Sequence, residues 1–261
     1  MREGEPQPEE KEGESREHIL VVDFLRHGRS TYKENYAQEQ EDDLTPEGVE
    51  QVRQTAERIV YSIDPAEEIV VLWTSPRWRA QASIRILEQI LQERGITYRS
   101  VTTLSSLRSL DQKDTVAMQY EWDKLKEEGI PAEIAYQQDV RFSNDPENIE
   151  PPTRVRRRAE RVLHWLSYLN RHAETKGKRL HILTVSHSEV LQPVLTDIFR
   201  ERLQQGQFVQ PGEDVRVALS YNTDNKQTSV SADFCGVHRE GLIFNDKTRK
   251  IEKPPAATEP A

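Results

Sequence analysis

Short apolar runs rich in β-branched residues alternate along this chain with longer stretches of helical periodicity. The strand-like runs cover residues 18–25, 68–73, 97–103 and 179–186. The helical stretches cover residues 45–63, 75–95, 162–177 and 188–203. Because helices that connect successive strands are typical of parallel strand pairs, this alternation predicts a layered α/β domain with a mainly parallel sheet.

Two dipeptides predict where the first helices begin. Thr45 followed by Pro46 is the pattern of an N-cap residue and a first helical position. Ser75 and Pro76 repeat this pattern ahead of the second helix, which is predicted to end at Gly95.

The charge distribution restricts the partners that the chain can take. The 261 residues carry a formal net charge of −9, so we expect no general attraction to nucleic acids or to acidic membranes. Residues 1–17 contain seven Glu, and residues 252–261 are rich in Pro and Ala; both segments are predicted to be disordered tails. Residues 18–251 are long enough for one domain. Anion binding must therefore come from a local basic cluster.

Cysteine content and the N-terminal apolar run indicate the cellular compartment. Cys235 is the single cysteine, which excludes an internal disulfide and is typical of a reducing environment. The apolar run at 19–25 is too short to span a membrane and lacks a basic leader or a small-residue cleavage site. We therefore expect a cytoplasmic protein.

Three polar motifs follow three of the predicted strands. They are "RHG" at 26–28, "SPRWRA" at 75–80 and "SHSE" at 186–189. In α/β sheets, ligand-binding groups gather beyond the carboxyl ends of the strands, so we expect the motifs to meet at one edge. Gly28 is expected to supply the turn that ends the first strand.

Four side chains in these motifs, Arg26, His27, Arg79 and His187, together suit a dianionic phosphoryl group. Guanidinium groups match its oxygens, and helix N-termini add backbone donors. Neighbouring cations keep an imidazole neutral, so His27 is a candidate nucleophile. Arg26, Arg79 and a protonated His187 would stabilise the transition state. We expect no metal and no cofactor, because the remaining histidines lack the spacing of a metal site.

Two further segments depart from the strand and helix alternation. Residues 104–152 contain clusters of Asp, Lys, Asn and Pro and are predicted to be an insertion over the site. Residues 212–251 are predicted to form a β meander, because strand-like runs there are separated by turn sequences. The basic stripe at 154–161 is interpreted as a solvated helix face, with contact to an acidic partner or substrate as the alternative.

Four sequence blocks resemble the histidine phosphatase superfamily, the phosphoglycerate-mutase-like proteins. They are "FLRHGRS" at 24–30, "LTPEGVEQV" at 44–52, "TSPRWRA" at 74–80 and "VSHSEVL" at 185–191, in the order of that family. The resemblance covers about residues 19–200. It implies a three-layer α/β/α sandwich with a mainly parallel central sheet, a phosphohistidine on His27, and phosphate contacts from the other three side chains of the cluster. It also implies a substrate-contacting hydroxyl at Ser30.

Three positions depart from the pattern of that family, and the one that matters least is Ala82, which replaces the Gln usually found three residues after Arg79. Its usual Asn, six residues after the nucleophile, is Lys33 here, and Asn35 is the candidate substrate contact instead. Its general-acid Glu is replaced by Ser106, and a serine cannot protonate a leaving alkoxide efficiently.

A carboxyl group elsewhere must then act as the acid. Glu189 is the leading candidate because it follows His187 by two residues and would lie at the same helix N-terminus. Asp111 and Asp114 are the alternatives.

The resemblance implies a metal-independent phosphomonoester hydrolase, with a phosphorylated small molecule or a phosphoprotein as substrate. A mutase, which returns the phosphoryl group to its substrate, is one alternative; the long mutase-specific blocks expected between Arg79 and His187 are absent. A catalytically weak phosphate-binding module is the other alternative, and Ser106 favours it. The oligomeric state is not predicted.

Overall fold

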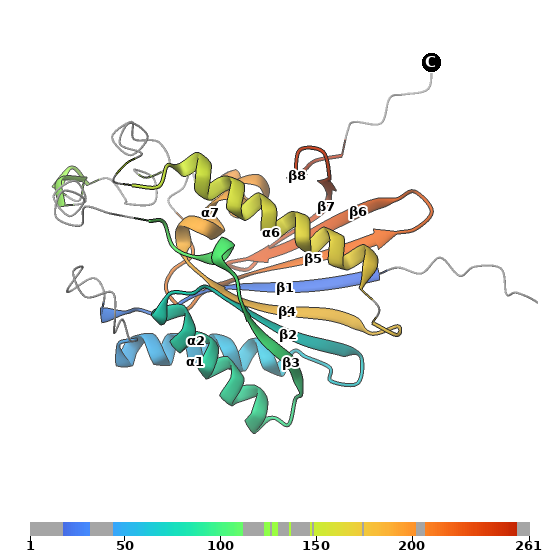
Figure 1. The fold of residues 1–261 in the computed structure, drawn as a ribbon, viewed down its shortest axis with the longest axis horizontal. Helices are drawn as coiled ribbons and strands as arrows, with labels where there is room; N and C mark the ends of the chain where they lie inside the picture. The colour runs from blue at the N-terminus through green and yellow to red at the C-terminus, as the bar shows by residue number, and fades with distance from the viewer. Residues whose placement is uncertain are drawn as a thin grey trace, which may run out of the picture.

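An eight-stranded sheet with helices on both faces forms the described part of the chain (Figure 1). The computed structural model describes residues 18–31, 44–111, 123–125, 127–129, 136, 147, 149–173, 175–201 and 207–254. The strands are β1 (His18–Arg26), β2 (Glu68–Thr74), β3 (Tyr98–Thr103), β4 (Arg179–Ser186), β5 (Asp214–Asn222), β6 (Gln227–Phe234), β7 (Val237–Asn245) and β8 (Lys250–Glu252). The helices are α1 (Pro46–Tyr61), α2 (Trp78–Glu93), the short 3-10 helix η3 (Ser105–Leu107), α6 (Pro152–His172) and α7 (Ser188–Ile198).

The sheet is parallel in one half and antiparallel in the other. Its strand order is β3-β2-β4-β1-β5-β6-β7-β8. The pairs β3–β2, β2–β4 and β4–β1 are parallel, whereas every pair from β1–β5 to β7–β8 is antiparallel. The predicted meander is therefore confirmed, but the expectation of a mainly parallel sheet is only partly correct. Tight turns connect β5 to β6, β6 to β7 and β7 to β8. A tight turn between neighbouring strands permits only antiparallel pairing.

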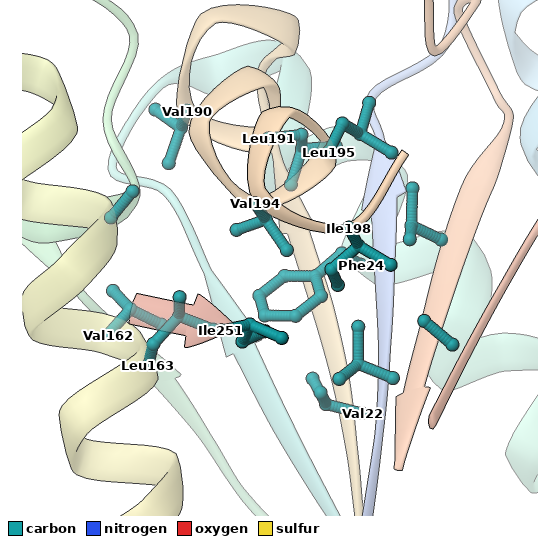
Figure 2. Packing of buried hydrophobic residues seen from close by; sticks show 14 of the residues in the cluster. Val22, Phe24, Val162, Leu163, Val190, Leu191, Val194, Leu195, Ile198 and Ile251 are labelled. Atoms are coloured by element: carbon teal, nitrogen blue, oxygen red, sulfur yellow. The ribbon is translucent and has the colours of Figure 1, made fainter. Parts of the chain in front are cut away.

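Three layers result because successive residues of a strand point to opposite faces. Leu25 of β1 packs with the helices α1 and α2 in one core cluster. Phe24, its neighbour, packs in the other core cluster with side chains of α6 and α7 (Figure 2). The predicted α/β/α sandwich is thus confirmed.

The first polar motif is held against the start of α1 by a close contact between two glycines. Thr45 caps α1 as predicted, because its hydroxyl accepts the N–H of Gly48 at 3.0 Å. A Cβ added to Gly28 would lie 2.2 Å from the Gly48 carbonyl oxygen, and one added to Gly48 would lie 2.0 Å from the Arg29 carbonyl oxygen. Gly28 does not have a positive φ, so what requires a glycine after the end of β1 is this close approach.

Several domain-level predictions remain untested. Residues 1–17 and most of the 104–152 segment lie outside the described residues, so the predicted tail and insertion stay predictions. At the other end, Glu252 belongs to β8, and the residues from 255 onward are not described. Among the described helices, none is long and apolar enough to cross a membrane.

Candidate active site

The three polar motifs meet at one edge of the sheet, as the parallel half of the fold requires. Arg26 ends β1 and lies opposite Ser186, which ends the neighbouring strand β4. The N–H of His27 donates to the Ser186 carbonyl at 3.1 Å. After β2, the N–H of Ser75 donates to the Val185 carbonyl at 3.1 Å, which brings the "SPRWRA" motif to the same place.

The His27 ring is held in one tautomer. Its Nδ1 lies 2.7 Å from the Gly28 carbonyl oxygen, which can only accept, so Nδ1 carries the proton. Its Nε2 accepts a hydrogen bond from Nε of Arg79 at 3.0 Å. The lone pair of Nε2 therefore points toward a guanidinium group in the first turn of α2.

His27 and His187 lie side by side and are both buried. Their ring centroids are 4.9 Å apart and the ring planes are inclined by 59°. Burial lowers the pKa of His27 well below 6.5, and the charges of Arg79, His187 and Arg26 lower it further. Burial likewise lowers the pKa of His187, followed by the charges of Arg79 and Arg77. The ligand-free site therefore favours two neutral imidazoles, in contrast to the expected protonated His187.

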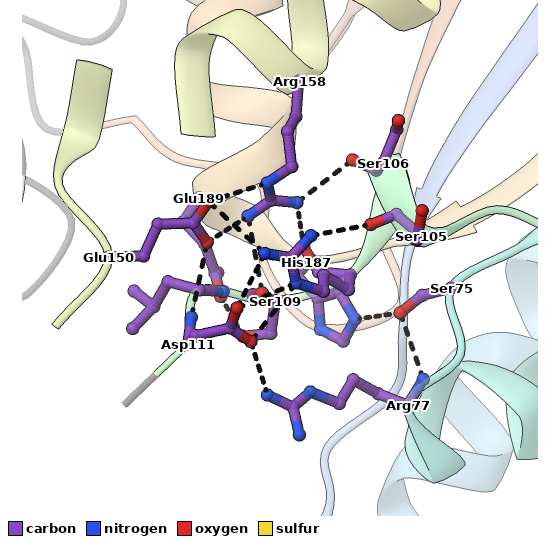
Figure 3. Close-up of polar contacts among 12 residues, drawn as sticks. Ser75, Arg77, Ser105, Ser106, Ser109, Asp111, Glu150, Arg158, His187 and Glu189 are labelled. Atoms are coloured by element: carbon purple, nitrogen blue, oxygen red, sulfur yellow. Dashed lines mark hydrogen bonds and ion pairs between the residues drawn. The ribbon is translucent and has the colours of Figure 1, made fainter. Parts of the chain in front are cut away.

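Ser75 has a role that the sequence did not predict. Its hydroxyl lies 2.8 Å from Nε2 of His187 and accepts the N–H of Arg77 at 3.2 Å (Figure 3). The prediction that Ser75 caps α2 is wrong, because this helix begins at Trp78 and Arg77 is its N-cap residue. The serine before the proline instead fixes the orientation of the second histidine.

The other predicted phosphate and substrate contacts are Arg26, Ser30 and Asn35, and the structure describes the first two of them. Arg26 is buried, and its Nη1 donates to the Val209 carbonyl at 2.6 Å. Ser30 is buried and forms an isolated antiparallel bridge with Leu44. Within the described residues, no hydrogen bond joins the Ser30 hydroxyl to the cluster of two arginines and two histidines. Asn35, like Lys33 and Asp114, lies outside the described residues.

Ser106 brings no acid to the site. It is 3% exposed within η3, and its carbonyl oxygen accepts a hydrogen bond from Nη1 of Arg158 at 3.1 Å. Arg158 lies in the basic stripe that was expected to be a solvated helix face, yet it is only 6% exposed. The stripe therefore includes one arginine that points into the protein.

Glu189 lies in the first turn of α7, where three donors surround its carboxylate. Its Oε1 accepts the hydroxyl of Ser109 and the N–H of Leu110, the latter at 3.2 Å (Figure 3). Its Oε2 accepts the hydroxyl of Ser188 at 3.1 Å. Burial raises the pKa of Glu189, but the hydrogen bonds from the Ser109 hydroxyl and from its own backbone N–H, with the charges of Arg79 and Arg26, outweigh burial and lower the pKa. The ligand-free carboxylate is therefore ionised at neutral pH.

Asp111, the alternative acid, is engaged in ion pairs. Its carboxylate accepts from Nη2 of Arg108 at 2.6 Å and from Nη2 of Arg77 at 3.5 Å. The hydrogen bond from Arg108 is the main cause that lowers the pKa of Asp111, and the charges of Arg108 and Arg77 add to it. Half of the Asp111 side chain is exposed, so this aspartate lies at the rim. Among the described residues, no group of three or more His, Cys, Asp or Glu side chains is arranged to hold a metal ion.

Comparison with known proteins gives a family and a set of similar folds. The family model for the histidine phosphatase superfamily (branch 1) matches residues 22–230. Comparison with curated protein sequences gives no match.

Solved structures similar to this one cover most of the chain. A mycobacterial glucosyl-3-phosphoglycerate phosphatase is 16% identical with a TM-score of 0.51, covering 79% of this chain and 92% of that chain. A putative α-ribazole-5′-P phosphatase from Escherichia coli is 20% identical with a TM-score of 0.53, covering 81% of this chain and 94% of that chain. A phosphoglycerate mutase from Bacillus anthracis is 13% identical with a TM-score of 0.52, covering 85% of this chain and 92% of that chain. At these identities the likeness is one of fold.

Proposed function

Because this chain belongs to the histidine phosphatase superfamily, we propose that it is a phosphomonoester hydrolase that works through a phosphohistidine on His27. One observation carries the proposal. The Nδ1–H of His27 is committed to the Gly28 carbonyl, so Nε2 presents its lone pair beside the guanidinium of Arg79. A neutral imidazole whose unprotonated nitrogen faces cations suits attack on a phosphoryl group.

In the first step, Nε2 of His27 attacks phosphorus and the bond to the leaving oxygen breaks. The Nε–H of Arg79, which donates to Nε2 of His27 in the structure, turns to a phosphoryl oxygen as the substrate enters. Arg26 and Arg79 stabilise the charge that spreads over the equatorial oxygens. In the second step, water attacks the phosphohistidine, the P–N bond breaks, and inorganic phosphate leaves with the imidazole neutral again.

The leaving alkoxide needs a proton, and we assign this proton to Glu189. Although burial raises its pKa, the hydrogen bond from the Ser109 hydroxyl and the charges of Arg79 and Arg26 lower it, so the carboxylate is ionised at neutral pH. A bound phosphate dianion brings negative charge to the same arginines and so raises the pKa of the carboxyl group. Glu189 then takes up a proton together with the substrate and donates it to the leaving oxygen.

A phosphorylated small molecule is the proposed substrate class, with a phosphoprotein as the alternative. Two proteins of similar fold bear the names glucosyl-3-phosphoglycerate phosphatase and α-ribazole-5′-P phosphatase, and both names specify small phosphorylated metabolites. We further propose that the reaction needs no metal and that it takes place in the cytoplasm, the latter because the chain has a single cysteine.

A catalytically weak phosphate-binding module is the second candidate. Two observations favour it: Ser106 replaces the acid that the family uses, and the pKa of Glu189 is lowered in the ligand-free site. A module of this kind would retain the cationic pocket and bind phosphate without turnover.

Trapping of the phosphoenzyme distinguishes the two candidates. The protein is mixed with an activated aryl phosphate and quenched in alkali, where phosphohistidine survives, and the modified residue is located by mass spectrometry. The proposal predicts phosphate release and modification of His27, with both lost in His27→Ala and retained in His238→Ala, which removes an exposed histidine on β7. Binding of orthovanadate without phosphate release would establish the binding module, and turnover by His27→Ala would exclude His27 as nucleophile.

A further inference from the structure

One buried arginine binds residues 106–110, the segment that begins within η3 and continues to the residues that contact Glu189 (Figure 3). Arg158 comes from α6 and uses all five N–H groups of its guanidinium. Its Nη1 donates to the carbonyl of Ser106 at 3.1 Å and to that of Arg108 at 2.7 Å. Its Nη2 donates to the carbonyl of Ser109 at 3.5 Å. Three carbonyls of one short segment are therefore fixed by a single side chain.

Glu150 fixes the guanidinium in turn. Its two carboxylate oxygens accept from Nε and Nη2 of Arg158 at 3.0 and 2.7 Å, and it is 4% exposed. Its own N–H donates to the carbonyl of Asp111 at 2.8 Å, and its carbonyl accepts the hydroxyl of Tyr136 at 2.7 Å. The planar, forked ion pair leaves Arg158 little freedom to reorient.

The peptide group between Ser109 and Leu110 lies between this ion pair and the site. Its carbonyl oxygen faces the Arg158 guanidinium at 3.5 Å, and its N–H faces Oε1 of Glu189 at 3.2 Å. The hydroxyl of Ser109 donates to the same Oε1. Because a peptide group is planar, holding its carbonyl end sets the direction of its N–H. The cation and the carboxylate thus lie at the ends of the peptide dipole where each is stabilised.

We propose that Arg158 is a positioning residue for Glu189: with Glu150 it fixes the 106–110 segment, whose Ser109 hydroxyl and Leu110 N–H hold the carboxylate at the site. The inference rests on the proposed function, because it gives Glu189 the task of proton donor. It also explains how a chain with Ser106 in place of the family's acid holds another carboxyl group, that of Glu189, in a fixed position. That serine is part of the segment that Arg158 holds.

The test compares Arg158→Lys with the wild-type protein on two substrates. Lysine keeps the charge but cannot form the fork or reach three carbonyls at once. An alkyl phosphate needs acid assistance, whereas an activated aryl phosphate needs little. We expect kcat for the alkyl phosphate to fall roughly 10- to 100-fold and kcat for the aryl phosphate to change by less than about threefold.

Two further variants separate positioning from general damage to the fold. Arg156→Lys is the matched control, because Arg156 lies on the same helix and, among the described residues, forms its ion pair with Asp197 of α7 at 3.3 Å and no hydrogen bond with the 106–110 segment. It should leave both rates unchanged. Ser109→Ala removes the hydroxyl that Arg158 is proposed to position, so the double variant with Arg158→Lys should lose little more alkyl-phosphate activity than either single variant.

A measurement without turnover separates failure of this inference from failure of the proposed function. The carboxyl pKa of Glu189, followed by NMR in the ligand-free protein, should rise in Arg158→Lys and not in Arg156→Lys. This result would support the positioning role even if no phosphohistidine forms. Equal loss on both esters, additive effects in the double variant, or an unchanged Glu189 pKa would overturn the inference. Wild-type protein that binds vanadate without turnover would overturn only the proposed function.

Discussion

Nε of Arg79 donates to Nε2 of His27 at 3.0 Å, so the arginine proposed to bind phosphate contacts the nitrogen proposed as the nucleophile. This contact keeps the imidazole neutral, since a protonated Nε2 could not accept the bond. In the proposed mechanism, substrate binding exchanges one hydrogen-bond partner of Arg79 for another and exposes the lone pair of Nε2 at the same time.

Replacing Arg79 by Gln should therefore change the pH dependence as well as the rate. After burial, the charge of Arg79 is the main cause that lowers the pKa of His27, so its removal raises this pKa. The acidic limb of the kcat/KM profile, where His27 loses its proton, should move to higher pH. The rate should fall roughly 10²- to 10³-fold because a transition-state donor is lost.

Kinetics on an aryl phosphate between pH 4 and 8 measure this shift. Arg29→Gln is the control, because Arg29 is an exposed arginine of the same motif that pairs with Glu47. A limb that stays in place or moves to lower pH in Arg79→Gln would contradict the assignment.

Replacing Glu189 by Gln should impair the hydrolysis of unactivated esters only. Glutamine has nearly the same shape but cannot donate the proton, so alkyl phosphate turnover should fall about 10²-fold while aryl phosphate turnover is largely kept. Asp111→Asn removes the competing carboxylate at the rim and should have little effect on either ester. The ratio of the two rates is the measurement, and selective loss in Asp111→Asn would transfer the acid role to that residue.

Replacing Gly48 by Ala should destabilise the protein and disturb the first motif. The added Cβ would lie 2.0 Å from the carbonyl oxygen and 2.7 Å from the nitrogen of Arg29, and both are backbone atoms. We expect the free energy of unfolding to fall by about 1 to 3 kcal/mol. Chemical denaturation measures this loss. Gly95→Asn, at a position with open space and a positive φ that Asn tolerates, should cost much less.

His181 makes a contribution to stability that depends on pH. Its Nε2 lies 2.7 Å from Asp23 of β1 and its Nδ1 lies 2.6 Å from Glu68 of β2, so two carboxylates hold the ring across three strands. Burial lowers the pKa of His181, but the hydrogen bonds to both carboxylates outweigh it and raise the pKa. Burial raises the pKa of Asp23, and the hydrogen bonds from His181 and Arg216 outweigh it and lower the pKa.

The direction in which stability changes with pH follows from the raised pKa of His181 and the lowered pKa of Asp23. Stability from protonated His181 is fully present below its ordinary pKa of 6.5 and is lost as the pH rises through the raised pKa. Stability from ionised Asp23 is present above 3.8 and is lost as the pH falls through the lowered pKa. The loss of unfolding free energy in His181→Gln should therefore be larger at pH 5.5 than at pH 9, by on the order of 1 kcal/mol. Equal losses at both pH values would refute a charged His181, and His238→Gln serves as an exposed control.

The motifs predicted the layers of the fold and the place where Arg79 and His187 meet, because strand endings and helix starts are local signals. They predicted the meander at 212–251 but not its antiparallel pairing with β1, which joins it to the parallel strands in one sheet and makes antiparallel pairs the larger share. They also missed the partner of His187, because Ser75 before a proline has the pattern of a helix cap.

No local sequence pattern predicts the ion pair of Arg158 and Glu150. An arginine among several arginines on one helix has the composition of a solvated face, and the sequence does not show which of them points inward. Its partners are three carbonyls about fifty residues away along the chain. Backbone acceptors of this kind have no sequence signature.

The central place of β1 in the sheet also bears on when the candidate site is assembled during synthesis. Leu20 of this strand lies opposite Leu180 of β4 on one side and Leu219 of β5 on the other. A nascent chain that has emerged only as far as residue 150 already contains Arg26, His27 and Arg79, but neither neighbour of β1. Such long sequence separation makes assembly of the edge slow and late. His27, the proposed nucleophile, is thus translated among the first residues of the domain, and the strand that carries it is among the last to be paired on both sides.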